Sequence, residues 1–155
     1  MGEIGELVLP EAILPALEAD SRQAALRTLC ASAAQALGLH PRLVYDAVME
    51  RESLGGTGVG EGVAIPHARL PALDHPVGAF ARLTVPVDFD AVDQRPADLV
   101  FMLLAPAHAG ADHLKALSKV SRAFRRPEFR ERLRAAHTRE AVLALFRRPA
   151  ESEAA

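Results

Sequence analysis

The chain has 155 residues, of which 50% are apolar and 25% charged, and its formal net charge is -2. This length is typical of one domain, and the apolar fraction favours a packed core over a disordered chain. No apolar run reaches the roughly 18–20 residues of a membrane-spanning helix, and the acidic N-terminus does not resemble a signal peptide. The single cysteine, Cys30, can form neither an internal disulfide nor a multi-thiolate metal site, which favours a cytoplasmic location.

Helical periodicity begins after the first twenty residues. Asp20 occupies a capping position before an alanine-rich stretch, which we expect to form a helix that ends at Gly38. Pro41 begins a second expected helix, over about 41–51. The residues of this helix that we expect to face inward are Leu43, Val44, Ala47 and Val48.

The middle of the chain has the pattern of strands. Residues 78–85 alternate in polarity, which predicts a half-buried strand, and the continuous apolar run 98–105 predicts a central strand. Helical spacing returns over 114–124, and Pro127 and Thr138 each begin a further short helix, the last ending near 147. This order predicts a single α/β domain with a mixed β-sheet flanked by helices.

A glycine cluster, residues 55–62, leads into the short apolar segment 63–65 and then into Pro66 and His67. The chain contains no Gly-Lys pair, which excludes a P-loop, and it has no GxGxxG, GxSxG or HExxH motif. From the glycines alone, the simplest interpretation is a mobile connection between a helix and a strand. For a lone histidine, a surface or structural role is the commoner interpretation.

His67 also allows a chemical interpretation. Pro66 restricts the backbone that enters it, and a restrained imidazole with one nitrogen hydrogen-bonded can offer the lone pair of the other to a phosphoryl group. Amides of the glycine cluster and a nearby guanidinium could receive the phosphoryl oxygens. Phosphoryl transfer depends mainly on positioning and charge stabilisation, so a small site of this kind is sufficient.

The stretch from Arg51 to His67, RESLGGTGVGEGVAIPH, resembles the signature of the mannitol/fructose-type IIA proteins of the bacterial phosphotransferase system (PTS EIIA type-2), in particular their stand-alone nitrogen-regulatory branch, EIIA-Ntr. The resemblance continues in the same order through four later segments: 89–93, 98–105, 113–117 and 127–133. It covers residues 5–147 as one domain and leaves 148–155 as an expected disordered tail.

The resemblance implies a site and a partner. It implies that His67 accepts a phosphoryl group from an HPr-like phosphocarrier, supported by Arg51 and His113, without a cofactor or a metal. In this site the phosphate-binding residues are expected to be Thr57, Gly58 and Gly60. Without the family, Arg51 is interpreted as a cation at a helix C-terminus and His113 as a polar residue at a helix start.

The nitrogen branch implies that the protein regulates partner proteins according to its phosphorylation state. The alternative function is a sugar-specific, fructose/mannitol-type IIA that passes the phosphoryl group to a separate IIB. Ala68-Arg69 stands where many family members have Gly-Lys. The extra methyl is small and the cation is retained, so we expect phosphorylation to survive, while the choice of donor depends on these flanking residues.

Two other features have simpler interpretations. The histidines of the segment 108–113 lack the spacing of a helical metal site, so a loop followed by a helix start is favoured. Residues 115–148 contain 11 Lys/Arg and 3 Glu, a net charge of +8, whereas the rest of the chain has a net charge of -10. We favour the solvated face of amphipathic helices over nucleic-acid binding, because the basic region has little aromatic interleaving.

Overall fold

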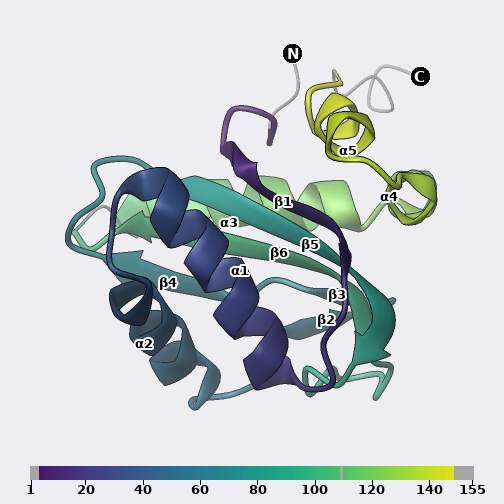
Figure 1. Cartoon of the computed structure of the whole chain (residues 1–155), viewed down its shortest axis with the longest axis horizontal. Helices are drawn as coiled ribbons and strands as arrows, with labels where there is room; N and C mark the ends of the chain where they lie inside the picture. The colour runs from purple at the N-terminus through teal and green to yellow at the C-terminus, as the bar shows by residue number, and fades with distance from the viewer. Residues whose placement is uncertain (1–3, 109, 149–155) are drawn as a thin grey trace.

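The computed structural model describes residues 4–108 and 110–148, so the expected tail lies outside the described residues apart from Arg148. Helices cover both faces of a mixed sheet, which confirms the predicted α/β class (Figure 1). The elements are, in chain order, β1 (Val8–Leu17), α1 (Arg22–Leu37), α2 (Pro41–Glu52), β2 (Gly58–Gly60), β3 (Val63–Ala64), β4 (His67–Leu70), β5 (Val77–Val87), β6 (Ala97–Pro106), α3 (Gly110–Phe124), α4 (Pro127–Ala135) and α5 (Arg139–Phe146).

The sheet has the strand order β1-β5-β6-β3-β2, and β4 also pairs with β6. β5 is antiparallel to β6, while β1 runs parallel to β5. β3 and β4 both run parallel to β6 and follow one another along the same edge, with Val63 opposite Leu99 and His67 opposite Leu103. The central strand β6 therefore sets the position of the strand that begins with His67.

Two hydrophobic clusters lie on opposite faces of this sheet. α1 and α2 cover one face of the sheet, where side chains such as Ala68 and Met102 are buried. These two helices lie in front of the sheet in Figure 1. α3, α4 and α5 cover the other face, where Ile65 and Phe101 are buried. Successive side chains of a strand point to opposite faces, so His67 points to the same face as Ile65, two residues before it. This is the face that α3 covers.

The helix ends follow the sequence signals with one shift. Ser21, not Asp20, is the N-cap of α1, and its hydroxyl accepts a hydrogen bond of 3.1 Å from the Ala24 amide. Both residue types cap well, so the sequence does not decide between neighbours. Gly38 ends the helix with a left-handed φ of 72°, a conformation that costs glycine little.

The burial of α2 is narrower than predicted. Val44 and Val48 are fully buried, as expected, but Leu43 is 48% exposed and Ala47 is only partly buried. The buried stripe follows i, i+4 spacing and continues to Glu52, which is 5% exposed. The carboxylate of Glu52 is therefore buried in line with two apolar side chains of the same helix face.

Two strand predictions need correction. β5 is half-buried only in its second part, where Thr84 and Val85 are exposed, because Val77 to Ala81 are buried on both faces between the two helical layers. β1 was not predicted, since Pro10 and Pro15 interrupt its pattern. Proline is accommodated at a sheet edge, and β1 is an edge strand that pairs only with β5.

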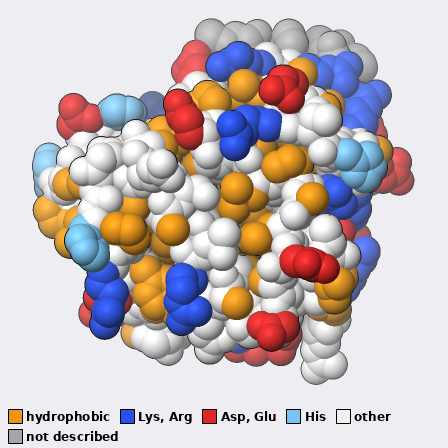
Figure 2. All heavy atoms as spheres, in the orientation of Figure 1, with side chains coloured by type: hydrophobic (Ala, Val, Ile, Leu, Met, Phe, Trp, Pro, Cys, Tyr) orange, Lys and Arg blue, Asp and Glu red, His pale blue; other side chains and the backbone are white. Residues whose placement is uncertain are grey.

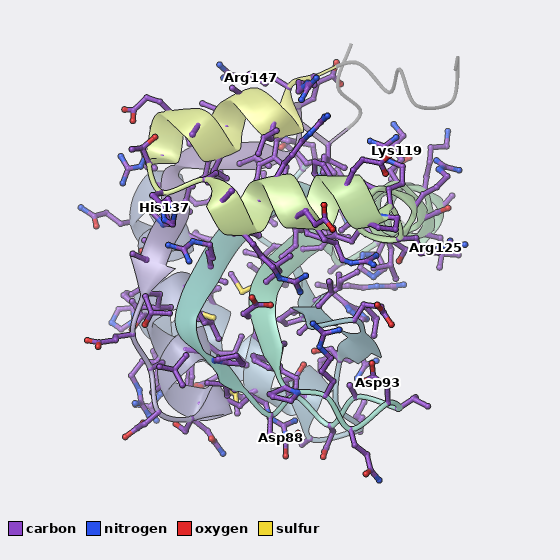
Figure 3. All side chains as sticks on the ribbon, turned by 90° about the vertical axis from the view of Figure 1, so that its right-hand side faces the viewer. Asp88, Asp93, Lys119, Arg125, His137 and Arg147 are labelled. Atoms are coloured by element: carbon purple, nitrogen blue, oxygen red, sulfur yellow. The ribbon has the colours of Figure 1, made fainter. Side chains whose placement is uncertain are left out.

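Charged side chains are distributed unevenly over the surface. Figure 2 shows them interspersed with uncharged ones over α1 and α2, and basic ones gathered at the upper right, near α4 and α5. Seen from the side, Asp88 and Asp93 lie at one end of the molecule, and Lys119, Arg125 and Arg147 lie toward the other (Figure 3). None of the helices within the described ranges has the length and apolarity needed to cross a membrane.

Candidate functional site

His67 is the first residue of β4 and is partly buried. Its ring Nδ1 lies 2.9 Å from the carbonyl oxygen of Ile65, which can only accept a hydrogen bond. Nδ1 therefore carries the proton, and Nε2 of the neutral ring keeps its lone pair. The local backbone is held from the other side as well, because the Leu103 amide of β6 donates a 2.9 Å hydrogen bond to the Pro66 carbonyl.

His113 lies in the first turn of α3, and its ring centroid is 5.6 Å from that of His67, as the resemblance implied. The residue is only 6% exposed, and its Nδ1 has no hydrogen-bond partner among residues 4–108 and 110–148. Burial lowers the pKa of His113, and the charges of His67 and Arg69 lower it further. His113 is therefore held in its neutral form beside the other imidazole.

Arg51 lies in the last turn of α2, in the helical layer opposite α3. Its Nη1 donates a 3.2 Å hydrogen bond to the Gly55 carbonyl, just beyond the helix end. This is the position of a cation that stabilises a helix C-terminus. The loop after the helix leads to Thr57, whose carbonyl accepts a 3.0 Å hydrogen bond from the Ile65 amide. The loop that follows Arg51 is therefore hydrogen-bonded to the residue two positions before His67.

The predicted phosphate-binding residues have other partners in the structure. The Thr57 hydroxyl donates to the Glu52 carboxylate, and the Gly58 amide donates a 3.0 Å hydrogen bond to the Phe89 carbonyl. Gly60 pairs with Val63, four residues before His67, which corresponds to roughly 13 Å along the sheet. Phosphate binding by these three residues stays a prediction. Gly58–Gly60 of the glycine segment form β2, a strand of the sheet rather than a mobile loop.

Two residues of the site region were given no role in the site from the sequence, where Arg69 was considered only for its effect on the choice of donor. Arg69 follows His67 by two positions in β4, so the two side chains share a face of the strand, and the charge of Arg69 acts on His113. Glu52 is buried and accepts hydrogen bonds from Thr57 and, at 3.1 Å, from Arg22. The sequence held a signal for each residue. Arg69 follows His67 at the i, i+2 spacing of side chains on one strand face, and Glu52 continues the i, i+4 spacing of the apolar residues Val44 and Val48.

The remaining candidate residues do not join this site. The described part of the chain holds no group of three or more His, Cys, Asp or Glu side chains arranged to bind a metal ion. His108 is exposed, and His40 caps α2, accepting a hydrogen bond from the Arg42 amide. Cys30 is buried in the core, and burial raises the pKa of its thiol to about 12, so it is not a reactive nucleophile at neutral pH.

A comparison with protein families identifies the chain. The model of the family described as "Phosphoenolpyruvate-dependent sugar phosphotransferase system, EIIA 2" matches residues 6–148. The chain belongs to this family. It is thus a component of a phosphotransfer system, and the predicted family is confirmed. This EIIA 2 protein brings together two of the residues that the resemblance singled out, His67 and His113.

Individual relatives indicate the branch. A nitrogen regulatory protein of Bradyrhizobium diazoefficiens is 49% identical over 146 residues, which cover 94% of this chain and 95% of the relative. A fructose-specific EIIA component of Haloferax volcanii is 47% identical over 97 residues, 63% of each chain. The crystal structure of nitrogen regulatory protein IIA-Ntr from Neisseria meningitidis superposes with a TM-score of 0.85 at 36% identity, covering 92% of this chain and 98% of that one. These similarities favour the nitrogen-regulatory branch over a sugar-specific IIA.

Proposed function

We propose that this EIIA 2 protein is a nitrogen-regulatory IIA component whose His67 accepts a phosphoryl group at Nε2 from an HPr-like phosphocarrier. The observation that carries the proposal is the hydrogen bond between Nδ1 of His67 and the Ile65 carbonyl. It keeps the proton on Nδ1 and leaves a nucleophilic lone pair on Nε2 of a ring that is only partly buried.

The transfer needs no proton from the protein. The Nε2 lone pair attacks the phosphorus of the donor phosphohistidine, a new N–P bond forms, and the N–P bond of the donor breaks. The electron pair of the broken bond returns to the donor nitrogen, and Nδ1 of His67 keeps its proton on the Ile65 carbonyl. Positioning and charge stabilisation therefore do most of the catalytic work in such a site.

Nearby groups are suited to stabilise the phosphoryl oxygens. His113 is neutral and has a buried Nδ1 available for a new hydrogen bond, and it lies in the N-terminal turn of α3, where the helix dipole favours an anion. Arg69 brings a guanidinium to the same strand face as His67. We assign Arg51 to the site as well, as a cation that would exchange its Gly55 contact for the phosphoryl group.

The output that we propose is regulation of partner proteins by the phosphorylation state of His67. The nitrogen regulatory relative is 49% identical over 94% of the chain, which supports this output. A phosphoryl group adds about -1.5 to -2 charge to the surface near His67, which is enough to change a docking surface. An HPr-like donor and the reduced Cys30 support a cytoplasmic location.

The experiment incubates the protein with phosphoenolpyruvate, the general first enzyme of the system and an HPr-like carrier. Intact-mass measurement should show one acid-labile phosphoryl group on the wild-type protein and none on the His67→Ala variant. His75→Ala is the matched control, since His75 is exposed and contacts Asp74, and it should be labelled normally. Labelling that persists in His67→Ala would refute the site.

A second step separates the two functions of the family. The phosphorylated protein is mixed with IIB proteins and their sugars, and the loss of label is followed. A nitrogen-regulatory protein should keep its phosphoryl group under these conditions. Rapid transfer to a IIB would instead support the sugar-specific alternative.

A further inference from the structure

We propose that Glu52 and Thr57 are positioning residues for His67, because they hold the carbonyl group that fixes its tautomer. The inference rests on the proposed function for its consequence in phosphoryl transfer. The effect on which ring nitrogen of His67 carries the proton does not depend on that function. Neither residue contacts the ring directly, so both act through the backbone of Ile65.

The first link joins the end of α2 to the loop that follows it. Glu52 is buried, with 2% of its side chain exposed, and a buried carboxylate requires partners for its charge and its lone pairs. Nη1 of Arg22 donates to Oε1 at 3.1 Å, and the Thr57 hydroxyl donates to Oε2. Both carboxylate oxygens are thus used, and Thr57 is bound to the helix end by its side chain.

The second link joins Thr57 to the imidazole. The Thr57 carbonyl accepts the Ile65 amide at 3.0 Å, and the Ile65 carbonyl faces Nδ1 of His67 at 2.9 Å. A continuous path therefore runs from the carboxylate of Glu52 through two backbone groups of Ile65 to the ring. The direction of the last hydrogen bond decides which nitrogen keeps the lone pair.

The path matters because the position of the Ile65 backbone depends on where Thr57 lies. On the other side, the next carbonyl, that of Pro66, is held by the Leu103 amide of the central strand β6, and the proline ring restricts its own φ. Thr57 lies between Gly56 and Gly58, the residues whose backbones pack against Asp90 and Ala91. Glycine allows more backbone conformations than other residues, so the side-chain bond to Glu52 adds to the constraint that the Gly58–Phe89 hydrogen bond places on Thr57.

Arg22 extends this support to a third element. Its guanidinium contacts Glu52 at 3.1 Å and Asp90 at 3.4 Å, and it lies over the Phe89 ring with its carbon 5.8 Å from the ring centroid. The first turn of α1, the end of α2 and the loop after β5 therefore meet at Glu52. The charged cluster at this junction lies in the helical layer of α1 and α2 and fixes Glu52, the residue that binds Thr57.

The experiment compares Thr57→Val with Thr57→Ser. Valine removes the hydroxyl and keeps the shape, while serine keeps the hydroxyl. The long-range proton–nitrogen NMR spectrum of the histidine rings at about pH 8, where an ordinary imidazole is neutral, reports which nitrogen of His67 is protonated. We expect wild type and Thr57→Ser to carry the proton on Nδ1, and Thr57→Val to show a mixture of tautomers. We also expect Thr57→Val to accept the phosphoryl group about tenfold more slowly.

Thr138→Val is the matched control, because the Thr138 hydroxyl caps α5 by accepting the Ala141 amide at 3.1 Å and is not part of this path. It should leave the His67 spectrum and the transfer rate unchanged. Glu52→Gln is the second variant in case Thr57→Val does not fold, and it should shift the tautomer in the same direction. An unchanged His67 spectrum in Thr57→Val, or in Glu52→Gln where that variant is used, would overturn the proposal. If wild type is not phosphorylated at all, the proposed function fails, and the ring spectrum still decides the positioning role.

Discussion

His67 and His113 lie in one site, but their ring nitrogens have different surroundings. Nδ1 of His67 faces a backbone carbonyl at 2.9 Å, whereas Nδ1 of His113 is buried without a partner in the described residues. A carbonyl fixes the tautomer of the first ring, and burial keeps the second ring neutral. The proposed roles of phosphoryl acceptor for His67 and hydrogen-bond donor for His113 rest on these different environments.

The lowered pKa of His113 predicts how stability depends on pH. The folded state binds a proton at His113 less readily than the unfolded chain, whose histidine titrates near ~6.5. The contribution of His113 is therefore fully present above that pH and is lost as the pH falls through the lowered pKa. In urea unfolding from pH 7.5 down to pH 5, we expect wild type to lose more stability than His113→Gln.

The difference between the two pH slopes isolates His113, because all other titrating groups are common to both proteins. Arg69 and His67 contribute to the lowered pKa, so His67→Gln should reduce the slope of the wild-type protein in the same direction but less. Parallel slopes for wild type and His113→Gln would contradict the assignment of His113 as a buried, neutral imidazole.

At the scale of secondary-structure elements, α5 is held to the sheet by aromatic contacts. Phe146, in its last turn, is 1% exposed and makes edge-to-face contacts with Phe80 of β5 and Phe101 of β6, at centroid distances of 5.2 and 5.6 Å. Phe124 and Phe129 bring α3 and α4 into the same cluster. The helical layer that carries His113 therefore rests on a shared aromatic core.

Removing one of these rings should cost much of the stability. We expect Phe146→Ala to lower the free energy of unfolding by about 3–5 kcal/mol, the range for truncating a buried phenylalanine. Val92→Ala is the control, since Val92 is 96% exposed, and it should change stability by less than about 0.5 kcal/mol. Denaturant unfolding measures both, and equal effects of the two variants would show that α5 does not depend on this core.

The elements differ in how far local sequence could predict them. β6 was predicted because a continuous apolar run suits a strand buried on both faces, and α1, α2 and α5 begin at residues whose side chains cap them. β1 contains two prolines, and β4 has only four residues, so neither carries a local signal. Pairing with β5 and β6 creates these two strands, and such pairing depends on distant parts of the chain.

The site shows the same division. His67 could be singled out from the sequence, because the proposed acceptor role rests on a motif that is contiguous in sequence. The bond between Thr57 and Glu52 could not, although both residues belong to that motif, because a hydroxyl in a glycine-rich segment has many possible partners. The structure shows that the Thr57 hydroxyl binds Glu52, and the proposed positioning role rests on this contact.

At the scale of the whole molecule, the net charge of -2 combines a C-terminal region of +8 with a remainder of -10. In the side view, Asp88 and Asp93 lie far from Lys119, Arg125 and Arg147 (Figure 3). His113 lies in the first turn of α3, whereas the basic residues of this helix lie further along it, up to Arg122 in its last turn. Phosphorylation of His67 would therefore place about -1.5 to -2 charge near the N-terminal end of this helix, where the dipole favours it.

The central feature of the proposed transfer is the nitrogen of His67 that receives the phosphoryl group. The decisive measurement is the long-range proton–nitrogen NMR spectrum of the phosphorylated, nitrogen-15-labelled protein, with phosphorus coupling to identify the bonded nitrogen. The hydrogen bond from Nδ1 to the Ile65 carbonyl predicts that phosphorus couples to Nε2 of His67 and that Nδ1 keeps its proton. A phosphoryl group on Nδ1 of His67, or on any other histidine, would contradict it.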